Sequence, residues 1–188
     1  MTLWGRFNDA GSVGFGTMDG DTITIHQGDM FAGAKATGET LLLADVKLLA
    51  PCEPTKMIAL WNNFHALAAK MDMPEPDEPL YFLKANNSFL GPDELIQRPK
   101  SYDGKVVYEG ELGIVIGKQC KNVSEADAEG FIFGYTCIND VTAAELISKD
   151  KTFAQWVRSK SFDTFGVYGP VIATGLDVAT LVVKTVLH

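Results

Sequence analysis

The chain has 188 residues, of which 46% are hydrophobic and 21% charged, a composition typical of a soluble globular protein with one domain, or one domain and a small appendage. Its formal net charge of -8 and its lack of a basic run argue against nucleic acid as a main partner, because phosphates are bound through Lys and Arg side chains. No stretch approaches the ~18 apolar residues of a membrane span, and the N-terminus lacks the apolar core of a signal peptide, so neither secretion nor membrane contact is expected.

The first fifty residues show short strand patterns separated by turn signals. Asp19-Gly20 stands between two such patterns, at residues 14–17 and 22–25, as expected for a hairpin. We expect a small N-terminal β module over residues 1–50. Pro51 and Pro54 mark a boundary after it, so that a larger unit covers residues 52–188.

The segment after this boundary combines a helix, a loop and a strand. Residues 64–71 have the composition of a short helix, with His65 near its start. The run 74–79 is rich in proline and acidic residues, which makes it too stiff and too charged for a regular element, so we expect a loop. A buried strand is expected at 81–83 and a turn at 91–93.

The second half of the chain alternates strand and helix patterns. Ser124, followed three residues later by Asp127, resembles a capping box and predicts a helix of one or two turns that ends before Gly130. The other elements expected here are strands over 106–116, 131–138 and 181–187 and a helix over 142–149. The fold class is therefore predicted to be α+β and strand-rich.

Three widely spaced cysteines, Cys52, Cys120 and Cys137, form no Cys-x-x-Cys pattern. An odd number without such spacing indicates neither a disulfide framework nor a zinc knuckle. A reducing cytoplasm is the simplest location, and we expect the protein there.

Three acidic residues are the strongest candidates for chemistry. Glu109 and Glu111 lie two apart in the strand expected at 106–116, so their side chains share a face and their backbone positions are ~6.6 Å apart. Asp140 follows the strand expected at 131–138. Like charges held this close need a counter-charge, and a hard divalent cation such as Mg²⁺ or Mn²⁺ favours oxygen ligands. The three carboxylates therefore predict a metal site.

Each acidic residue also has a simpler interpretation. Glu-x-Glu on a strand is most often a solvated face paired with Lys or Arg. Asp140, at a strand-to-helix transition, could equally be the N-cap of a helix that begins near Thr142. Both alternatives stay open on the sequence alone.

A series of motifs follows in order along the chain: Asn62-Asn63-Phe64-His65-Ala66, Tyr81-Phe82-Leu83-Lys84, Tyr108-Glu109-Gly110-Glu111-Leu112, Gly134-Tyr135-Thr136, Asn139-Asp140-Val141-Thr142-Ala143, Lys160-Ser161-Phe162-Asp163-Thr164-Phe165 and Gly169-Pro170. Together these motifs resemble the fumarylacetoacetate hydrolase family, over roughly residues 52 to 188. The resemblance implies a mixed β-roll core and a divalent metal, Mg²⁺ or Mn²⁺, held by Glu109, Glu111 and Asp140.

The resemblance also implies a class of reaction. Members act on 2-oxo, 2,4-dioxo or 2-hydroxy-dienoic acids whose adjacent oxygens chelate the metal, and the metal stabilises an enolate. We expect hydrolysis of a C–C bond in a 2,4-dioxo acid from the catabolism of aromatic compounds. Isomerisation or decarboxylation on the same site are the alternatives. The implied partners are a small anionic oxo acid and a second copy of the chain in a homodimer.

Two further residues match catalytic positions of the family. Lys160 corresponds to the active-site lysine, which would place an ammonium beside the developing negative charge; otherwise it is a solvent-exposed lysine. His65 corresponds to a histidine on a flexible lid that acts as base or activates water, a role that suits imidazole. Its simpler interpretation is a surface helix residue.

The chain departs from the family pattern in three places. Ala68 stands where many members carry Glu three residues after the histidine, so a partner for His65 must come from elsewhere, or His65 works alone. Ala144, Glu145 and Ile147 stand where the family often has Arg, Asp and Gln. Members usually continue beyond the position of His188, so the catalytic domain is expected to be incomplete at its C-terminus, and a truncated, non-catalytic metal-binding protein is a further alternative.

Overall fold

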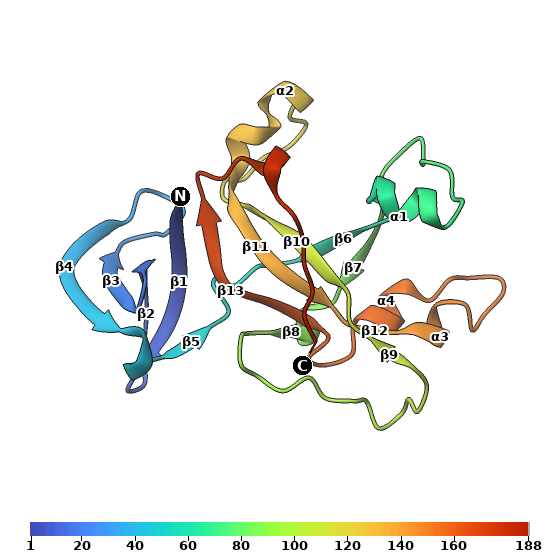
Figure 1. The fold of residues 1–188 in the computed structure, drawn as a ribbon, viewed down its shortest axis with the longest axis horizontal. Coiled ribbons are helices and arrows are strands. Elements are labelled where there is room, and N and C mark those ends of the chain that lie inside the picture. The colour runs from blue at the N-terminus through green and yellow to red at the C-terminus, as the bar shows by residue number, and fades with distance from the viewer. Residues whose placement is uncertain (188) are drawn as a thin grey trace.

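A nine-stranded sheet runs through the protein in the computed structural model, which describes residues 1–187 (Figure 1). Its strands are ordered β10-β11-β13-β1-β2-β3-β4, with β5 paired to β1 and β8 paired to β13. All pairs are antiparallel except β8 with β13, which makes the sheet mixed. The strands are β1 Thr2–Asp9, β2 Ser12–Asp19, β3 Thr22–Gln27, β4 Lys35–Leu42, β5 Lys47–Leu49, β8 Phe89–Leu90, β10 Gly110–Ile116, β11 Ile132–Asp140 and β13 Gly166–Thr174.

Two small sheets and four short helices accompany this sheet. β6 (Met57–Trp61) pairs with β7 (Leu80–Lys84), and β9 (Val106–Val107) pairs with β12 (Thr142–Ala143). The helices are α1 His65–Lys70, α2 Glu125–Ala128, α3 Ala144–Ile147 and α4 Trp156–Lys160, with 3-10 turns at Leu43–Asp45, Asn86–Ser88, Glu129–Phe131 and Val178–Thr180. None of the helices described is long and apolar enough to cross a membrane. The α+β, strand-rich prediction is confirmed.

The N-terminal strands join the rest of the molecule through the sheet itself. β2 and β3 form the predicted hairpin, with Gly20 at a positive φ of 54° that glycine adopts easily. β1 pairs with β13 in a register that sets Thr2 opposite Thr174 and Trp4 opposite Ile172. One continuous sheet therefore links the first fifty residues to the C-terminal part.

Two clusters of buried apolar side chains fill the interior. The first lies where the N-terminal strands meet β13 and contains Met30, Cys52, Tyr168 and Ile172. The second begins immediately after β11 and contains Tyr102, Val141, Ala143, Leu146 and Phe165. Because Val141 directly follows the last residue of β11, packing of the second cluster fixes the backbone at the end of that strand.

Most of the expected elements are present. The helix expected at 64–71, the strands expected at 81–83 and 131–138 and the turn at 91–93 are found, and Ser124 caps α2 by accepting a hydrogen bond from Asp127 N at 3.3 Å. The strand expected at 106–116 is interrupted at residues 108 and 109. The helix expected at 142–149 begins only at Ala144, because Thr142 and Ala143 pair with β9.

The strand predicted over residues 181–187 is wrong: the segment is assigned to no strand. Its β-branched residues favour extended backbone, but a strand also needs a neighbouring backbone with free hydrogen-bonding groups. The segment instead contacts β10 by a side chain, since Thr185 packs against Gly110, where a Cβ would collide with the threonine hydroxyl. Glycine at position 110 therefore leaves room for the Thr185 hydroxyl.

Candidate metal centre

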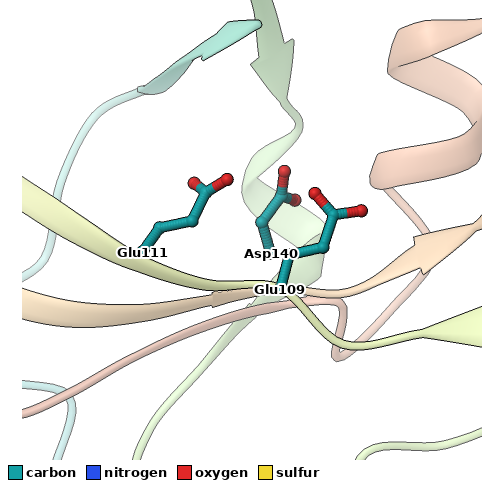
Figure 2. Close-up of side chains that lie close together, drawn as sticks. All are labelled: Glu109, Glu111 and Asp140. Atoms are coloured by element: carbon teal, nitrogen blue, oxygen red, sulfur yellow. The ribbon is translucent and has the colours of Figure 1, made fainter. Parts of the chain in front are cut away.

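The carboxylates of Glu109, Glu111 and Asp140 converge at the end of β10 and β11. Glu109 lies in the interruption before β10, Glu111 is the second residue of β10, and Asp140 is the last residue of β11. One oxygen from each side chain lies within 4.8 Å of the others. Figure 2 shows the three side chains pointing to the same side of the strands.

Antiparallel pairing of β10 with β11 brings these residues together. Gly110 stands opposite Asn139, so residues 109 and 140 meet where the ladder ends. Asp140 N donates to Glu109 O at 2.9 Å, and Glu109 N donates to Asn139 Oδ1 at 3.2 Å. The backbone of Glu109 is thus held although it belongs to no strand.

Two lysines reach the acidic cluster from other elements. Lys160, at the end of α4, donates to Glu109 Oε2 at 2.9 Å and to Asp140 Oδ2. Lys84, at the end of β7, donates to Asp140 Oδ1 and to Val141 O. Lys84 and Asp140 are each 1% exposed and Lys160 is 3% exposed. With all five groups ionised, the cluster keeps an excess of one negative charge.

The electrostatics of the cluster favour binding of a cation. Burial raises the pKa of Glu111 to about 7, and the negative charge of Asp140 adds to this, against the effect of Lys160. Burial lowers the pKa of Lys84, although its ion pair with Asp140 acts in the opposite direction. Within residues 1–187, no hydrogen bond or ion pair engages the Glu111 carboxyl. This carboxyl is therefore available as a ligand.

The donor set fits a hard divalent cation. All three candidate ligands offer carboxylate oxygens, and three such ligands leave coordination positions for water or for a chelating substrate. Asp140 binds two ammonium groups and caps no helix, since the N-cap of α3 is Ala143. The N-cap interpretation of Asp140 is therefore wrong.

His65 lies outside this cluster. It is the first residue of α1, and its side chain is 86% exposed. Among the described residues, its hydrogen bond joins Nδ1 to Glu75 Oε1, at 2.7 Å, and no bond connects it to the three carboxylates. Asn62 Nδ2 donates to Pro74 O at 3.0 Å and thereby ties the loop before Glu75 to the end of β6. The structure thus supplies a carboxylate partner for His65 from the acidic loop.

Three residues in or near the site were not assigned a role from the sequence. Lys84 was noted only as the last residue of the motif Tyr81-Phe82-Leu83-Lys84, and its burial against Asp140 depends on tertiary structure. Thr142 is buried and donates to Glu109 Oε1 at 2.8 Å. Glu75 belongs to a loop rich in acidic residues, where no spacing distinguishes it from Asp77 or Glu78.

Comparisons with known proteins add independent information on this chain. Residues 56–188 match the family model described as Fumarylacetoacetate (FAA) hydrolase C-terminal, and residues 3–51 match the model described as Rv2993c-like, N-terminal. An uncharacterized protein of Archaeoglobus fulgidus is 44% identical over 148 residues, which cover 79% of this chain and 58% of the relative. The mitochondrial oxaloacetate tautomerase fahd2 of Xenopus laevis is 38% identical, with coverage of 70% and 41%. This chain thus spans about half the length of these relatives.

Solved structures with the same fold include an isomerase and a hydrolase. The 5-carboxymethyl-2-hydroxymuconate delta-isomerase of Mycobacterium smegmatis superimposes with a TM-score of 0.82 and 41% identity, over 94% of this chain and 68% of that chain. The maleylpyruvate hydrolase of Sphingobium sp. SYK-6, in complex with manganese(II) ion and pyruvate, superimposes with a TM-score of 0.66 and 25% identity, over 93% and 67%.

Proposed function

The chain belongs to the fumarylacetoacetate hydrolase family, and we propose that it catalyses a divalent-metal-dependent enolisation of a 2-oxo acid, with isomerisation as the outcome. One observation carries this proposal: three carboxylates converge, and the Lys160 ammonium binds two of them. An isomerase and a tautomerase among the relatives, at 41% and 38% identity, support the same class of reaction.

Glu109, Glu111 and Asp140 would hold Mg²⁺ or Mn²⁺. When bound, the cation would supply a Lewis acid that polarises the 2-oxo group of a chelating substrate and favours its enolate. The manganese(II) ion and pyruvate in the maleylpyruvate hydrolase structure support a divalent cation and a 2-oxo acid as the ligands of this fold. Lys84 would keep Asp140 ionised and would fix the orientation of its carboxylate, because the Lys84 ammonium is buried against that carboxylate.

Lys160 would stabilise negative charge on the substrate, and His65 would transfer the proton. The Lys160 ammonium is fixed by two carboxylates beside the place where substrate oxygens would bind, so it would stabilise negative charge that develops there without reorganisation. His65 would move the proton at Nε2, because Nδ1 is engaged by Glu75. Since His65 is exposed, this role requires α1 to approach the bound substrate.

Isomerisation suits these residues better than hydrolysis does. It transfers one proton from the 2-hydroxyl of an enol to carbon and consumes no water. Position 68, one turn after His65, is a buried alanine, so no carboxylate on α1 activates water beside the histidine. Hydrolysis of a C–C bond in a dioxo acid is the second candidate, favoured by the His65–Glu75 pair, which could orient a water molecule. Decarboxylation would use the same enolate.

The expected homodimer remains a proposal as well. β10 is the terminal strand in the path of the large sheet, and Leu112, Ile114 and Ile116 on its outer face are exposed. An exposed apolar strand at the edge of a sheet favours association. A cytoplasmic location likewise stays a prediction from the sequence.

Hydrogen exchange at carbon tests the enolisation directly. The 188-residue chain, freed of metal with EDTA and supplied with Mn²⁺ or Mg²⁺, should catalyse exchange of the C3 protons of 2-oxo acids in D₂O, followed by NMR. Glu109→Gln should abolish the metal-dependent exchange, whereas Glu39→Gln, an exposed glutamate of β4, should not. Exchange at the uncatalysed rate with every 2-oxo acid and metal would contradict the proposal.

A further inference from the structure

We infer that a cavity of about 520 Å³ beside the acidic cluster is a subsite for an apolar, planar tail of the substrate. Six uncharged residues line it: Trp61, Pro79, Leu80, Tyr81, Phe82 and Trp156. The volume lies within the range of sites that bind small molecules. The subsite rests on the function proposed above. The 2-oxo acid group of the substrate would bind at the metal held by Glu109, Glu111 and Asp140, and the subsite would hold the rest of the molecule.

Phe82 connects the cavity with the acidic cluster. Phe82 and Lys84 lie two residues apart on β7, and both side chains are buried, so they leave the same face of the strand. Lys84 binds Asp140, and the Phe82 ring centroid lies 5.2 Å from Lys160 Nζ. One aromatic ring therefore separates the cavity from the ammonium group that contacts the candidate metal ligands.

Helix α4 contributes to both places through one face. Trp156 and Lys160 are four residues apart, which places them one turn from each other. The Trp156 ring stacks on Phe82, with centroids 5.5 Å apart and an interplanar angle of 17°. Trp61 continues the row, with its ring centroid 5.7 Å from that of Trp156. Three aromatic rings thus lead away from Lys160, and such surfaces favour flat apolar groups.

The charge around the cavity selects against an acidic tail. The six lining residues supply no ammonium or guanidinium group to pair with a second carboxylate. The loop that leads to Pro79 carries Glu75, Asp77 and Glu78, whose negative charges would repel one. The expected substrate class is therefore a 2-oxo acid with an aromatic or diene tail and a single carboxylate.

Titration calorimetry in the presence of Mn²⁺ tests the subsite with three ligands that share the 2-oxo acid head. These are 2-oxobutanoate, which has a minimal tail, 2-oxo-4-phenylbutanoate, which has an aromatic tail, and 2-oxopentanedioate, which has an acidic tail. We expect the phenyl compound to bind at least about tenfold more tightly than 2-oxobutanoate, and the dioate to bind no more tightly than 2-oxobutanoate.

Substitutions in the lining locate the tail. Trp61→Ala and Tyr81→Ala change exposed side chains and should each remove most of the phenyl advantage while the affinity for 2-oxobutanoate stays the same. Phe153→Ala, an exposed aromatic outside the lining, should leave all three affinities unchanged.

The results of these titrations distinguish a failure of the proposed subsite from a failure of the proposed function. Manganese-dependent binding of 2-oxobutanoate and of the phenyl compound with equal affinity would overturn the subsite and leave the proposed function intact. The same holds if both lining variants keep the phenyl advantage, because the tail would then bind elsewhere. If none of the three ligands shows manganese-dependent binding, the proposed function fails, and the subsite fails with it.

Discussion

Thr142 donates its hydroxyl to Glu109 Oε1 at 2.8 Å, from a buried position two residues after Asp140. The other oxygen of Glu109 accepts from Lys160 at 2.9 Å. Both oxygens of one candidate ligand are therefore held by side chains. Since Thr142 lies two residues after the end of β11, the segment that follows Asp140 also orients Glu109.

Replacing this hydroxyl by a methyl group should weaken metal binding. Thr142→Val keeps the shape of the side chain but leaves Glu109 Oε1 without its donor. Loss of a partner that orients a ligand costs roughly tenfold in metal affinity. We expect a decrease of that size in Mn²⁺ affinity by titration calorimetry. Thr152→Val, in an exposed loop, is the matched control. A folded T142V protein with the affinity of the wild type would exclude an orienting role for Thr142.

Removal of the metal should lower the stability of the folded chain. A ligand that binds only the native state stabilises it by about 2.7 kcal/mol at a hundredfold excess over its dissociation constant. Thermal unfolding in EDTA and then in excess Mn²⁺ should therefore show a clear upward shift of Tm. Glu109→Gln should lose the shift and Glu39→Gln should keep it. Equal shifts in both variants would place the metal elsewhere.

Glu111 should make the stability of the metal-free protein dependent on pH. Burial raises its pKa to about 7, whereas an unfolded glutamate titrates near 4.5. Below about pH 4.5 the carboxyl is protonated in both states, and as the pH rises through 7 the native state must ionise a group that its surroundings disfavour. The stability that Glu111 contributes is therefore present at low pH and is lost as the pH rises through about 7.

Urea unfolding at pH 5.5 and pH 8 in EDTA measures this effect. Glu111→Gln cannot ionise, so it should lose less stability than the wild type between the two pH values. The wild type should regain the difference when Mn²⁺ is added at pH 8, because the cation favours the ionised carboxylate. Identical losses in the wild type and in Glu111→Gln would show that this carboxyl titrates normally.

The sequence predicted the pairing of Glu109 with Glu111 because its information is local: the two residues are two apart, so their side chains share a face. That Asp140 joins them stayed open on the residues alone and followed from the family resemblance, because the contact of Glu109 with Asn139 joins positions 30 apart in sequence. The lysine pair was only half predicted, because contact of Lys84 with Asp140 joins positions 56 apart in sequence. The strand expected at 181–187 failed for the same reason, since composition gives extended backbone but no neighbour for it.

The two buried lysines should respond differently to substitution. Lys84→Met leaves the buried Asp140 with one counter-charge, and breaking such a pair should destabilise the protein by roughly 3 kcal/mol, measured by urea unfolding. Lys160→Met should change Mn²⁺ affinity little, because the loss of its hydrogen bonds to Glu109 and Asp140 is offset by the loss of a positive charge beside the cation. It should lower turnover by about a hundredfold or more, because it removes the donor beside the developing charge. Lys149→Met, at an exposed site, is the control. Wild-type turnover in Lys160→Met would remove Lys160 from the mechanism.

The pairing of His65 with Glu75 should fix the tautomer of the imidazole. Nδ1 lies 2.7 Å from Glu75 Oε1, and a carboxylate there favours the proton on Nδ1, which leaves Nε2 free to accept one. In Glu75→Ala, the ¹⁵N shifts of the two ring nitrogens should show a mixture of neutral tautomers. Turnover should fall by about tenfold, and Mn²⁺ affinity should not change. Asp77→Ala removes an acidic group from the same loop and should alter none of these measurements, so that equal effects of the two substitutions would indicate a general effect of loop charge.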